Sequence, residues 1–357
     1  MTTQEKLFPG EEQGLSSLVK AIIAWYRVQR RALPWRESPA PYHVWISEIM
    51  LQQTRIEAVI PYYRRFLEAL PTVQALADVD EDTLLKLWEG LGYYSRARNL
   101  KKAARCVAEE YGGHLPADAA QLRALPGIGA YTAGAIASIA YGLPEPAVDG
   151  NVLRVLMRVF ACHRDIMPER TKRLAAEALR PHYPAGEEAA LLTEGLMELG
   201  EVICLPNGQP KCEICPLAAL CKAREQGLQE ELPVRVVKTG RRQEQRTVLL
   251  LRCRGRYALH RREDKGLLAG LWELPNREGS LEREDVARCL EQEGLKPLAM
   301  ADAGRAKHIF SHVEWHMRAY FADCAEEHPD YVWVSPEDIR AHYALPTAFR
   351  HYAKQIK

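Results

Sequence analysis

The stretch LRALPGIGAYTAGAIASIA, residues 122–140, predicts two helices joined by a tight turn. Pro126 and Gly127 end the first helix, and the second begins near Ala130. Gly127 and Gly129 have no Cβ, so a partner can approach the backbone closely. The free N–H groups and the dipole of the second helix suit the turn to binding a phosphate oxygen. The alternative is a plain helical hairpin with a glycine turn.

Helical periodicity surrounds this hairpin from about Gly14 to Glu225, and Gly or Pro ends most segments. Residues 44–70, VWISEIMLQQTRIEAVIPYYRRFLEAL, form one continuing helical pattern. A charged segment that has no apolar stripe follows the helical region. After it come short β-like runs at 246–255, 256–263, 312–324 and 330–336, mixed with two helical stretches. These patterns predict a flexible N-terminus at 1–14, a helical domain at 15–225, a linker at 226–245 and a small α+β domain at 246–357.

The length of 357 residues favours two domains, since one hydrophobic core rarely serves so long a chain. A net charge of +1 argues against a polycation and leaves room for a local basic face. The nine cysteines are an odd number, and no apolar signal segment opens the chain, so a reducing, cytoplasmic compartment is expected. No apolar run is long enough to span a bilayer, and no membrane partner is expected.

Four of the cysteines cluster in CLPNGQPKCEICPLAALC, at Cys204, Cys212, Cys215 and Cys221, with gaps of seven, two and five residues. Four thiolates in one loop can hold one iron–sulfur cluster or one zinc ion. Basic residues close by would also suit the loop to a phosphate backbone. Four unrelated buried thiols are the alternative.

Two carboxylates stand out by their surroundings. Asp149 directly precedes the apolar helical run NVLRVLMRVF, where it is expected to cap the helix N-terminus and to be kept ionised there. Glu48 lies among hydrophobic neighbours in WISEIML, which should raise its pKa and keep it protonated. Read alone, Asp149 would be an ordinary cap and Glu48 a helix residue paired with an arginine.

In this order, the hairpin, the Asp149 segment and the cysteine cluster resemble the endonuclease III superfamily of DNA glycosylases. LPWR, VWISEIMLQQT, EGLGYYSRARNL and VDGNVLRV resemble segments of its adenine-specific branch, and the similarity covers nearly the whole chain. The resemblance implies an all-α helix-hairpin-helix glycosylase domain with an iron–sulfur cluster loop, followed by a small α+β Nudix-like domain. It also implies a monomer that removes adenine opposite 8-oxoguanine or guanine from double-stranded DNA, at the nucleoid.

The chemistry of that reaction needs an acid at the base and an anion beside the sugar, because the sugar becomes an oxocarbenium ion as adenine leaves. By the resemblance, Glu48 protonates N7 of adenine and handles the water, while Asp149 stabilises or covalently traps the sugar. Tyr131 and Asn151 are implied to help position Asp149. Tyr131 stands where bifunctional relatives carry a lysine, and a phenol cannot form an imine, so lyase activity should be weak or absent.

Further residues are assigned by the same resemblance. A flipped-out adenine leaves a gap that wedge and probe residues must enter, and an aromatic residue among glycines suits that task. The implied adenine pocket is Trp35, Arg36 and Glu194, and the implied contacts to DNA and 8-oxoguanine are Gln53, Thr54, Leu91, Tyr93, Gly127, Gly129, Phe310, Ser311 and His312. The acidic Mg²⁺ box of Nudix hydrolases is missing, so the second domain is expected to recognise 8-oxoguanine without hydrolysing phosphates.

The resemblance also implies that the four cysteines hold a 4Fe–4S cluster, with zinc as the alternative. The first gap departs from the family pattern, because it has seven residues where six are usual. A non-catalytic DNA-damage-binding protein on the same scaffold is the alternative function. A bifunctional pyrimidine glycosylase is a third, against which Tyr131 and the second domain argue.

Overall fold

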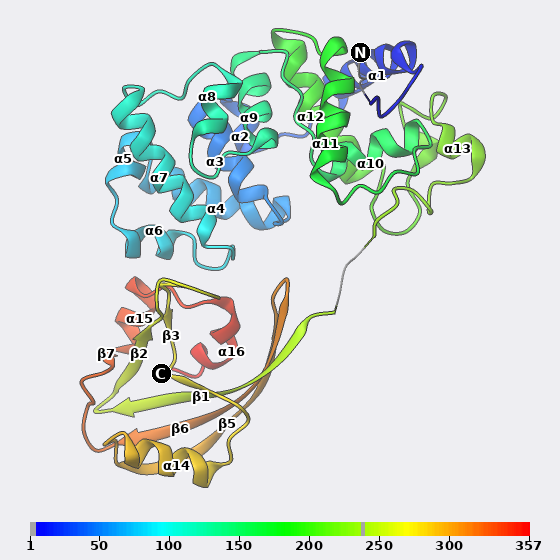
Figure 1. Cartoon of the computed structure of the whole chain (residues 1–357). Coiled ribbons are helices and arrows are strands. Elements are labelled where there is room, and N and C mark those ends of the chain that lie inside the picture. Colours follow the sequence, from blue (N-terminus) through cyan, green and yellow to red (C-terminus); the bar gives the residue numbers. More distant parts are fainter. Residues whose placement is uncertain (1–4, 237–239) are drawn as a thin grey trace. The chain divides into compact units, whose positions relative to one another are not determined.

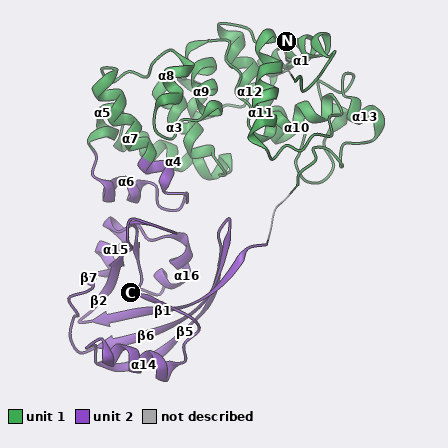
Figure 2. Cartoon of the chain, in the orientation of Figure 1, with its two compact units in different colours: residues 1–78, 99–238 green, residues 79–98, 239–357 purple. Residues whose placement is uncertain are grey.

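The structure, a computed structural model (Figure 1), describes residues 5–236 and 240–357. The chain forms two compact units. Unit 1 comprises residues 1–78 and 99–238, and unit 2 comprises 79–98 and 239–357 (Figure 2). Helical periodicity predicts residues 79–98 as part of the helical domain, but they pack with unit 2.

Unit 1 is helical, as predicted. Its regular elements are α1 (Glu12–Gln29), α2 (Pro34–Glu37), α3 (Pro41–Leu51), α4 (Ile56–Ala69), α5 (Val73–Asp78), α7 (Ser95–Glu110, whose first turn lies in unit 2), α8 (Ala119–Ala124), α9 (Ala130–Ala135), the π-helical η1 (Ile136–Ala140), α10 (Gly150–Val159), α11 (Glu169–Leu179), the short η2 (Arg180–His182), α12 (Glu187–Val202), η3 (Cys212–Ile214) and α13 (Lys222–Gln226). The hairpin at 122–140 is confirmed as α8, a turn, and α9 with η1, and its second helix begins at Ala130.

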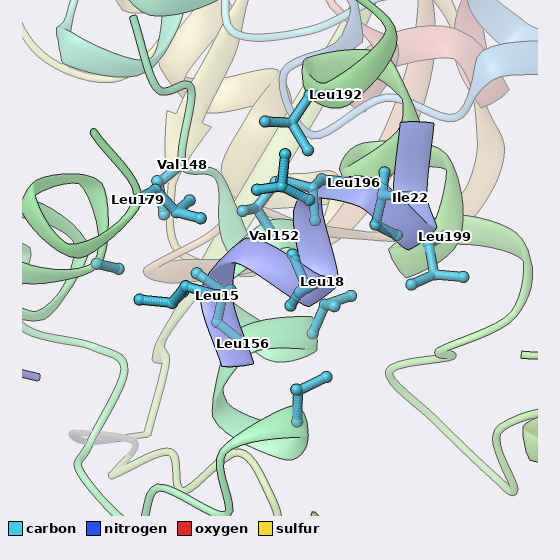
Figure 3. Close-up of a cluster of buried hydrophobic side chains, with 14 of the residues drawn as sticks. Leu15, Leu18, Ile22, Val148, Val152, Leu156, Leu179, Leu192, Leu196 and Leu199 are labelled. Carbon is cyan, nitrogen blue, oxygen red and sulfur yellow. The ribbon is translucent and has the colours of Figure 1, made fainter. Parts of the chain in front are cut away.

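The core beneath the site joins α1, α10 and α12 (Figure 3). Helical spacing places the apolar side chains of each helix on one face, and those labelled in the figure from these helices are Leu15, Leu18, Ile22, Val152, Leu156, Leu192, Leu196 and Leu199. Burial of each such side chain contributes roughly 1.5–3 kcal/mol. A Cβ on Gly195 would lie 2.7 Å from Cγ2 of Ile22, so α1 and α12 pack this closely only because that position is glycine. The core thereby fixes the start of α10, where Asp149 lies, against α12.

The pattern over residues 44–70 is not one helix. α3 ends at Leu51 and α4 begins at Ile56. Between them Gln53 adopts a left-handed φ of 59°, which turns the chain. The sequence does not show this break, because the apolar periodicity is the same on both sides of the four polar residues 52–55. The break places Gln53 and Thr54 at the site described below.

The N-terminal segment differs from the flexible one predicted for residues 1–14. Leu7 and Phe8 are buried, and the Phe8 ring centroid lies 4.7 Å from that of Phe160. Glu5 pairs with Arg164 and Arg170. The two apolar side chains therefore anchor residues 5–14 to the core, while residues 1–4 lie outside the described part of the chain.

The predicted linker, residues 226–245, is largely ordered. Arg158 Nε donates to the carbonyl of Leu232 at 2.8 Å, and the N–H of Ile166 donates to the carbonyl of Val234 at 3.1 Å. The segment as far as residue 236 therefore belongs to unit 1. Residues 237–239 lie outside the described range, and the first strand of unit 2 already begins at Arg242.

Unit 2 is a mixed sheet with helices on both faces, which agrees with the predicted α+β class. The strands follow the order β3-β2-β1-β6-β5, with β4 on β1, β7 on β2, and β1 parallel to β6. Alternate residues of β1 enter two cores, Val248 and Leu250 on the face of α15 and α16, and Leu249 and Leu251 on the face of α14. The bounds are β1 (Arg242–Cys253), β2 (Arg256–Arg261), β3 (Trp272–Glu273), β4 (Asn276–Glu278), α14 (Arg283–Gln292), β5 (Pro297–Ile309), β6 (Val313–Cys324), β7 (Val332–Val334), α15 (Pro336–His342), η4 (Thr347–Phe349) and α16 (Arg350–Ala353).

The segment 79–98 is held to α15 and to the residues after it by polar contacts of α6 (Glu81–Leu87) and of the turn that follows α6. Lys86 Nζ donates to the carbonyl of Tyr343 at 3.1 Å, and Glu89 Oε1 accepts from the N–H of Leu345 at 2.8 Å. These contacts explain why the segment packs with unit 2. No helix in the described part of the chain is both long and apolar enough to cross a membrane.

Candidate active site

A cavity of about 1140 Å³ opens in unit 1 between α3, the turn after it, α9, α10 and α12. A volume of this size admits a ligand as large as a nucleotide. Its walls bring together the predicted site residues Trp35, Arg36, Glu48, Gln53, Thr54, Tyr131, Asp149, Asn151 and Glu194. They come from segments far apart in the sequence, so the fold alone assembles them.

Glu48 is buried in the wall of this cavity, on α3, with 5% of its surface exposed. Burial raises the pKa of its carboxyl to about 7, and the nearby carboxylates of Asp149 and Glu194 raise it as well. The Tyr131 hydroxyl donates to Glu48 Oε2 at 2.5 Å and opposes this shift, as does the Arg36 guanidinium. Glu48 can therefore hold a proton near neutral pH, as its apolar sequence context predicts.

Tyr131 lies in the first turn of α9, directly after the hairpin turn. Its pKa is raised well above the usual value by burial and by Glu48 and Asp149, so the phenol stays protonated and acts as a donor. Met197 Sδ lies 2.9 Å from the same hydroxyl. The phenol thus orients one oxygen of Glu48 and leaves the other for a substrate.

Asp149 is the N-cap of α10, as predicted: Oδ1 accepts from the N–H of Val152 at 2.8 Å, and Oδ2 accepts from Nδ2 of Asn151 at 2.9 Å. Burial raises the pKa of Asp149, while the N–H groups of Val152 and Asn151 and the charge of Arg154 oppose the rise. The helix N-terminus was expected to keep Asp149 ionised; its N–H groups do favour the ionised form, but burial is the larger effect and raises the pKa. Two carboxyls with different partners, one with an apolar wall and one with capping donors, suit opposite roles.

Arg154 connects the Asp149 cap to the cysteine loop. Its Nη2 donates to Oδ1 of Asn151 at 2.8 Å, and its Nε donates to the carbonyl of Cys204 at 2.8 Å. A Cβ on Gly200 would lie 2.7 Å from Cβ of Asn151, so α12 also presses closely on this side chain. The position of Asn151, and through it of Asp149, thus depends on the start of the cysteine loop.

Two carboxylates at the cavity wall, Glu198 and Glu201, and the arginine that pairs with both of them, Arg31, escape sequence reasoning. Glu198 has 2% of its side chain exposed and accepts from Arg36 Nη2 at 2.9 Å and from Arg31 Nη2 at 3.0 Å. Glu194, the predicted pocket residue, accepts from the Tyr26 hydroxyl at 3.1 Å. The only local signal was a pair of carboxylates one helical turn apart in the apolar run LLTEGLMELG.

The hairpin turn has the geometry that its glycines predict. Gly127 has a φ of 76°, and a Cβ there would lie 2.6 Å from Cβ of Asn99. Gly129 is the N-cap residue of α9, and the space where its Cβ would stand is open. A Cβ on Gly134 would lie 2.4 Å from the carbonyl oxygen of Pro146, so α9 lies directly against the chain that leads to Asp149.

The predicted wedge residues lie in unit 2, on the turn between α6 and α7. Tyr93 is 47% exposed and has a left-handed φ of 47°, whereas Leu91 is buried. Arg96 donates to the carbonyls of Leu91 and Gly92, both at 3.1 Å, and its guanidinium lies 5.7 Å from the Tyr93 ring centroid. The turn is thus held in shape with Tyr93 as its exposed aromatic side chain.

Phe310, Ser311 and His312 form the tight turn between β5 and β6, closed by a hydrogen bond from the N–H of Phe310 to the carbonyl of Val313 at 2.8 Å. The Phe310 ring packs edge-on against Trp315, with 5.0 Å between ring centroids. Ser311 and His312 are exposed at the tip. An anchored aromatic with two exposed polar side chains above it can present hydrogen-bonding groups to a base.

Cys204, Cys212, Cys215 and Cys221 line one cavity in unit 1, beside α10 and α13. Burial raises the pKa of Cys215 to about 11, and the charges of the other three cysteines add to the rise. Arg158 Nη1 lies 3.3 Å from Sγ of Cys204. Within the described ranges no group of three or more Cys, His, Asp or Glu side chains is arranged to hold a single metal ion.

Comparison with known proteins adds family evidence to this geometry. Residues 46–181 match the model of the HhH-GPD superfamily base excision DNA repair protein, and residues 247–355 match a NUDIX domain. A thermostable thymine-DNA glycosylase matches with a TM-score of 0.54 and 28% identity, over 60% of this chain and 98% of that one. A trapped endonuclease III–DNA covalent intermediate matches with a TM-score of 0.52 and 25% identity, over 61% of this chain and 98% of that one.

The helix-hairpin-helix, the carboxylates around one cavity and these matches define a DNA glycosylase of base excision repair. The adenine DNA glycosylases of Mus musculus and Schizosaccharomyces pombe are 33% and 30% identical to the chain, over 84% and 90% of it and over 69% and 85% of their own lengths. That of Homo sapiens is 34% identical, over 84% of this chain and 66% of the human protein. The chain belongs to the adenine DNA glycosylase family.

Proposed function

We propose that this protein hydrolytically removes adenine from duplex DNA where it lies opposite 8-oxoguanine or guanine, without cutting the strand. The observation that supports this most is the pair of carboxyls in one cavity, Glu48 with a raised pKa and Asp149 held by capping donors. Release of free adenine from a duplex with 8-oxoguanine opposite tests the proposal. Binding of that duplex without release would favour the damage-binding alternative.

The two carboxyls divide the chemistry. Glu48 gives its proton to the base, which leaves as neutral adenine, and the carboxylate then accepts a proton from the attacking water. Asp149 faces the positive charge that develops on the sugar, with Asn151 and Val152 fixing its two oxygens. Trp35, Arg36 and Glu194 line the same cavity and are proposed to hold the extruded base.

The absence of a lysine at position 131 predicts a purely hydrolytic reaction. Borohydride should trap no covalent protein–DNA adduct during adenine release, because the Tyr131 phenol cannot form an imine. Tyr131→Lys serves as the comparison, since it places an amine that can form an imine at the same position. Adducts from the parent protein at the rate of adenine release would contradict this assignment.

The exposed tip of the β5–β6 turn predicts where 8-oxoguanine preference arises. In the full-length protein, Ser311→Ala with His312→Ala should reduce the preference for 8-oxoguanine over guanine opposite adenine by about tenfold, since one good base contact gives roughly 1–3 kcal/mol of discrimination. The full chain is required because residues 79–98 pack with unit 2.

Ser280→Ala with His342→Ala is the matched control, because both residues are exposed in the same unit but belong to other segments of it, after β4 and on α15. The preference should stay unchanged in this control. An equal loss in both double variants, or none in either, would place the recognition elsewhere, on Gln53, Thr54, Leu91 and Tyr93.

We also propose that the four cysteines hold a 4Fe–4S cluster. The support is that all four thiols line one cavity beside Arg158, and that such a cluster takes four cysteine thiolates, one for each iron. When bound, the cluster would lock the loop and neutralise thiolates that otherwise repel one another. The longer first gap is accommodated because Asn207, Gly208 and Gln209 are exposed.

Iron analysis tests this assignment. Protein purified without oxygen should be coloured and contain roughly 4 irons per chain. Cys212→Ser should lose the iron, and Cys289→Ser, on α14 of unit 2, should keep it. Colourless, zinc-containing parent protein would overturn the cluster in favour of zinc.

A further inference from the structure

Glu198 is a buried carboxylate for which the proposed chemistry has no direct use. It lies on α12, one turn after Glu194, and 2% of its side chain is exposed. A buried anion is stable only when it is paired, and Glu198 has two guanidinium partners, Arg31 and Arg36. Both of its oxygens are engaged by them, so it does not itself present a free acceptor to a substrate.

Arg36 is the partner that matters for the acid. Its side chain is 8% exposed, and its Nη2 lies 2.9 Å from Oε2 of Glu198, while its Nε lies 3.7 Å from Oε1 of Glu194. The guanidinium also lies 5.5 Å from the ring centroid of Tyr26. Its stronger contact is thus with Glu198, although its charge also acts on Glu48.

The charged and titratable groups around Glu48 come from each packed element: Arg36 from α2, Tyr131 from α9, Asp149 from the start of α10 and Glu194 from α12. Arg36 is the cation among them, and it favours loss of the Glu48 proton. A carboxylate that holds and neutralises Arg36 therefore protects the protonated state of the acid.

We propose that Glu198 is a positioning residue for the acid: its buried carboxylate holds Arg36 at the cavity wall and keeps that guanidinium from drawing the proton off Glu48. The inference rests on the proposed function, in which Glu48 is the proton donor. It assigns the Arg31–Glu198–Arg36 triad the task of setting the pH at which the enzyme works.

The test is the pH profile of single-turnover adenine release by the full-length holoprotein. The parent rate should fall as the pH rises through the titration of Glu48. In Glu198→Gln, Arg36 keeps only its longer contact with Glu194, at 3.7 Å. Its charge should then move this fall to lower pH by roughly 1 unit, because an opposite charge at this range shifts a carboxyl by 1 unit or more. At a pH above the parent's fall, the Glu198→Gln rate should therefore lie about tenfold further below the parent rate than it does at acidic pH.

Arg31→Gln is the opposite charge change in the same triad, and it leaves Arg36 paired with Glu198. It should move the fall to higher pH, which a merely structural defect would not do. Glu198→Asp keeps the charge and should return the fall toward its parent position. If Glu198→Gln does not fold, Arg31→Gln alone tests the proposal: a fall at higher pH supports it, and a fall at lower or unchanged pH contradicts it.

Glu188→Gln is the matched control, since Glu188 lies on the same helix α12, pairs with Arg27 at 3.3 Å and does not line the cavity. Its fall should stay at the parent pH. An unmoved fall in both Glu198→Gln and Arg31→Gln, with parent activity intact, would overturn the role of Glu198. A parent that releases no adenine, or whose rate does not fall with pH, would instead refute Glu48 as the acid.

Discussion

Asp149→Asn is expected to slow adenine release in a single turnover by ~10³-fold or more, while duplex affinity stays within a few-fold of the parent value. The amide has no charge to offer the developing oxocarbenium ion, so the loss falls on the transition state. Its Oδ1 can still accept from the N–H of Val152, which keeps the start of α10 in place. Quench-flow or manual single-turnover kinetics check the rate, and fluorescence anisotropy checks the duplex affinity.

Asp118→Asn is the matched control for this change. Asp118 also caps a helix, α8, by accepting from the N–H groups of Ala120 and Gln121, but it does not line the cavity. Its substitution should leave the rate of adenine release near the parent value. A near-parent rate in Asp149→Asn would instead remove Asp149 from the reaction.

Glu48→Gln is expected to slow adenine release by ~10²–10⁴-fold, the usual contribution of a positioned acid. The parent rate should be highest below pH 7 and fall above it, because the pKa of Glu48 is raised to about 7 and only the protonated carboxyl donates. The variant should lose that fall. A variant that kept both the parent rate and its pH profile would point to another acid.

The same substitution should stabilise the fold at high pH. The folded-state pKa of Glu48 lies above the usual value of a glutamate, so the protonated carboxyl favours folding and this contribution is lost as the pH rises through about 7. Glutamine carries no such penalty. Thermal melts should therefore show a higher Tm for Glu48→Gln than for the parent above pH 8, with a smaller difference at pH 5, the pattern of a site that gives up stability for activity.

Local signals in the sequence were sufficient for the hairpin, the Asp149 cap and the buried acid. Each depends on neighbours along the chain: glycines beside a helix start, a carboxylate before an apolar helix, and Glu48 among apolar residues of one helix. Strand β1 was equally clear, because its continuous apolar run is typical of a strand buried on both faces.

Features that depend on distant partners were not predictable. Glu198 lies 167 residues from Arg31 in the sequence, so the residues next to Glu198 do not indicate that it pairs with an arginine. Strand β5 escaped because it lies at the sheet edge, where its exposed faces give little apolar alternation and Gly304, with a φ of 89°, interrupts the register. The packing of residues 79–98 with unit 2 likewise rests on contacts more than 250 residues apart.

The most direct test of the proposed function is the single-turnover rate of adenine release from matched duplexes that differ only in the base opposite adenine. We expect the fastest release opposite 8-oxoguanine, slower release opposite guanine, and little opposite thymine, with free adenine as the product and the strand left intact until alkali is added. Tight binding of the 8-oxoguanine duplex with no adenine released, by cluster-containing protein, would contradict the account and leave a damage-binding protein in its place.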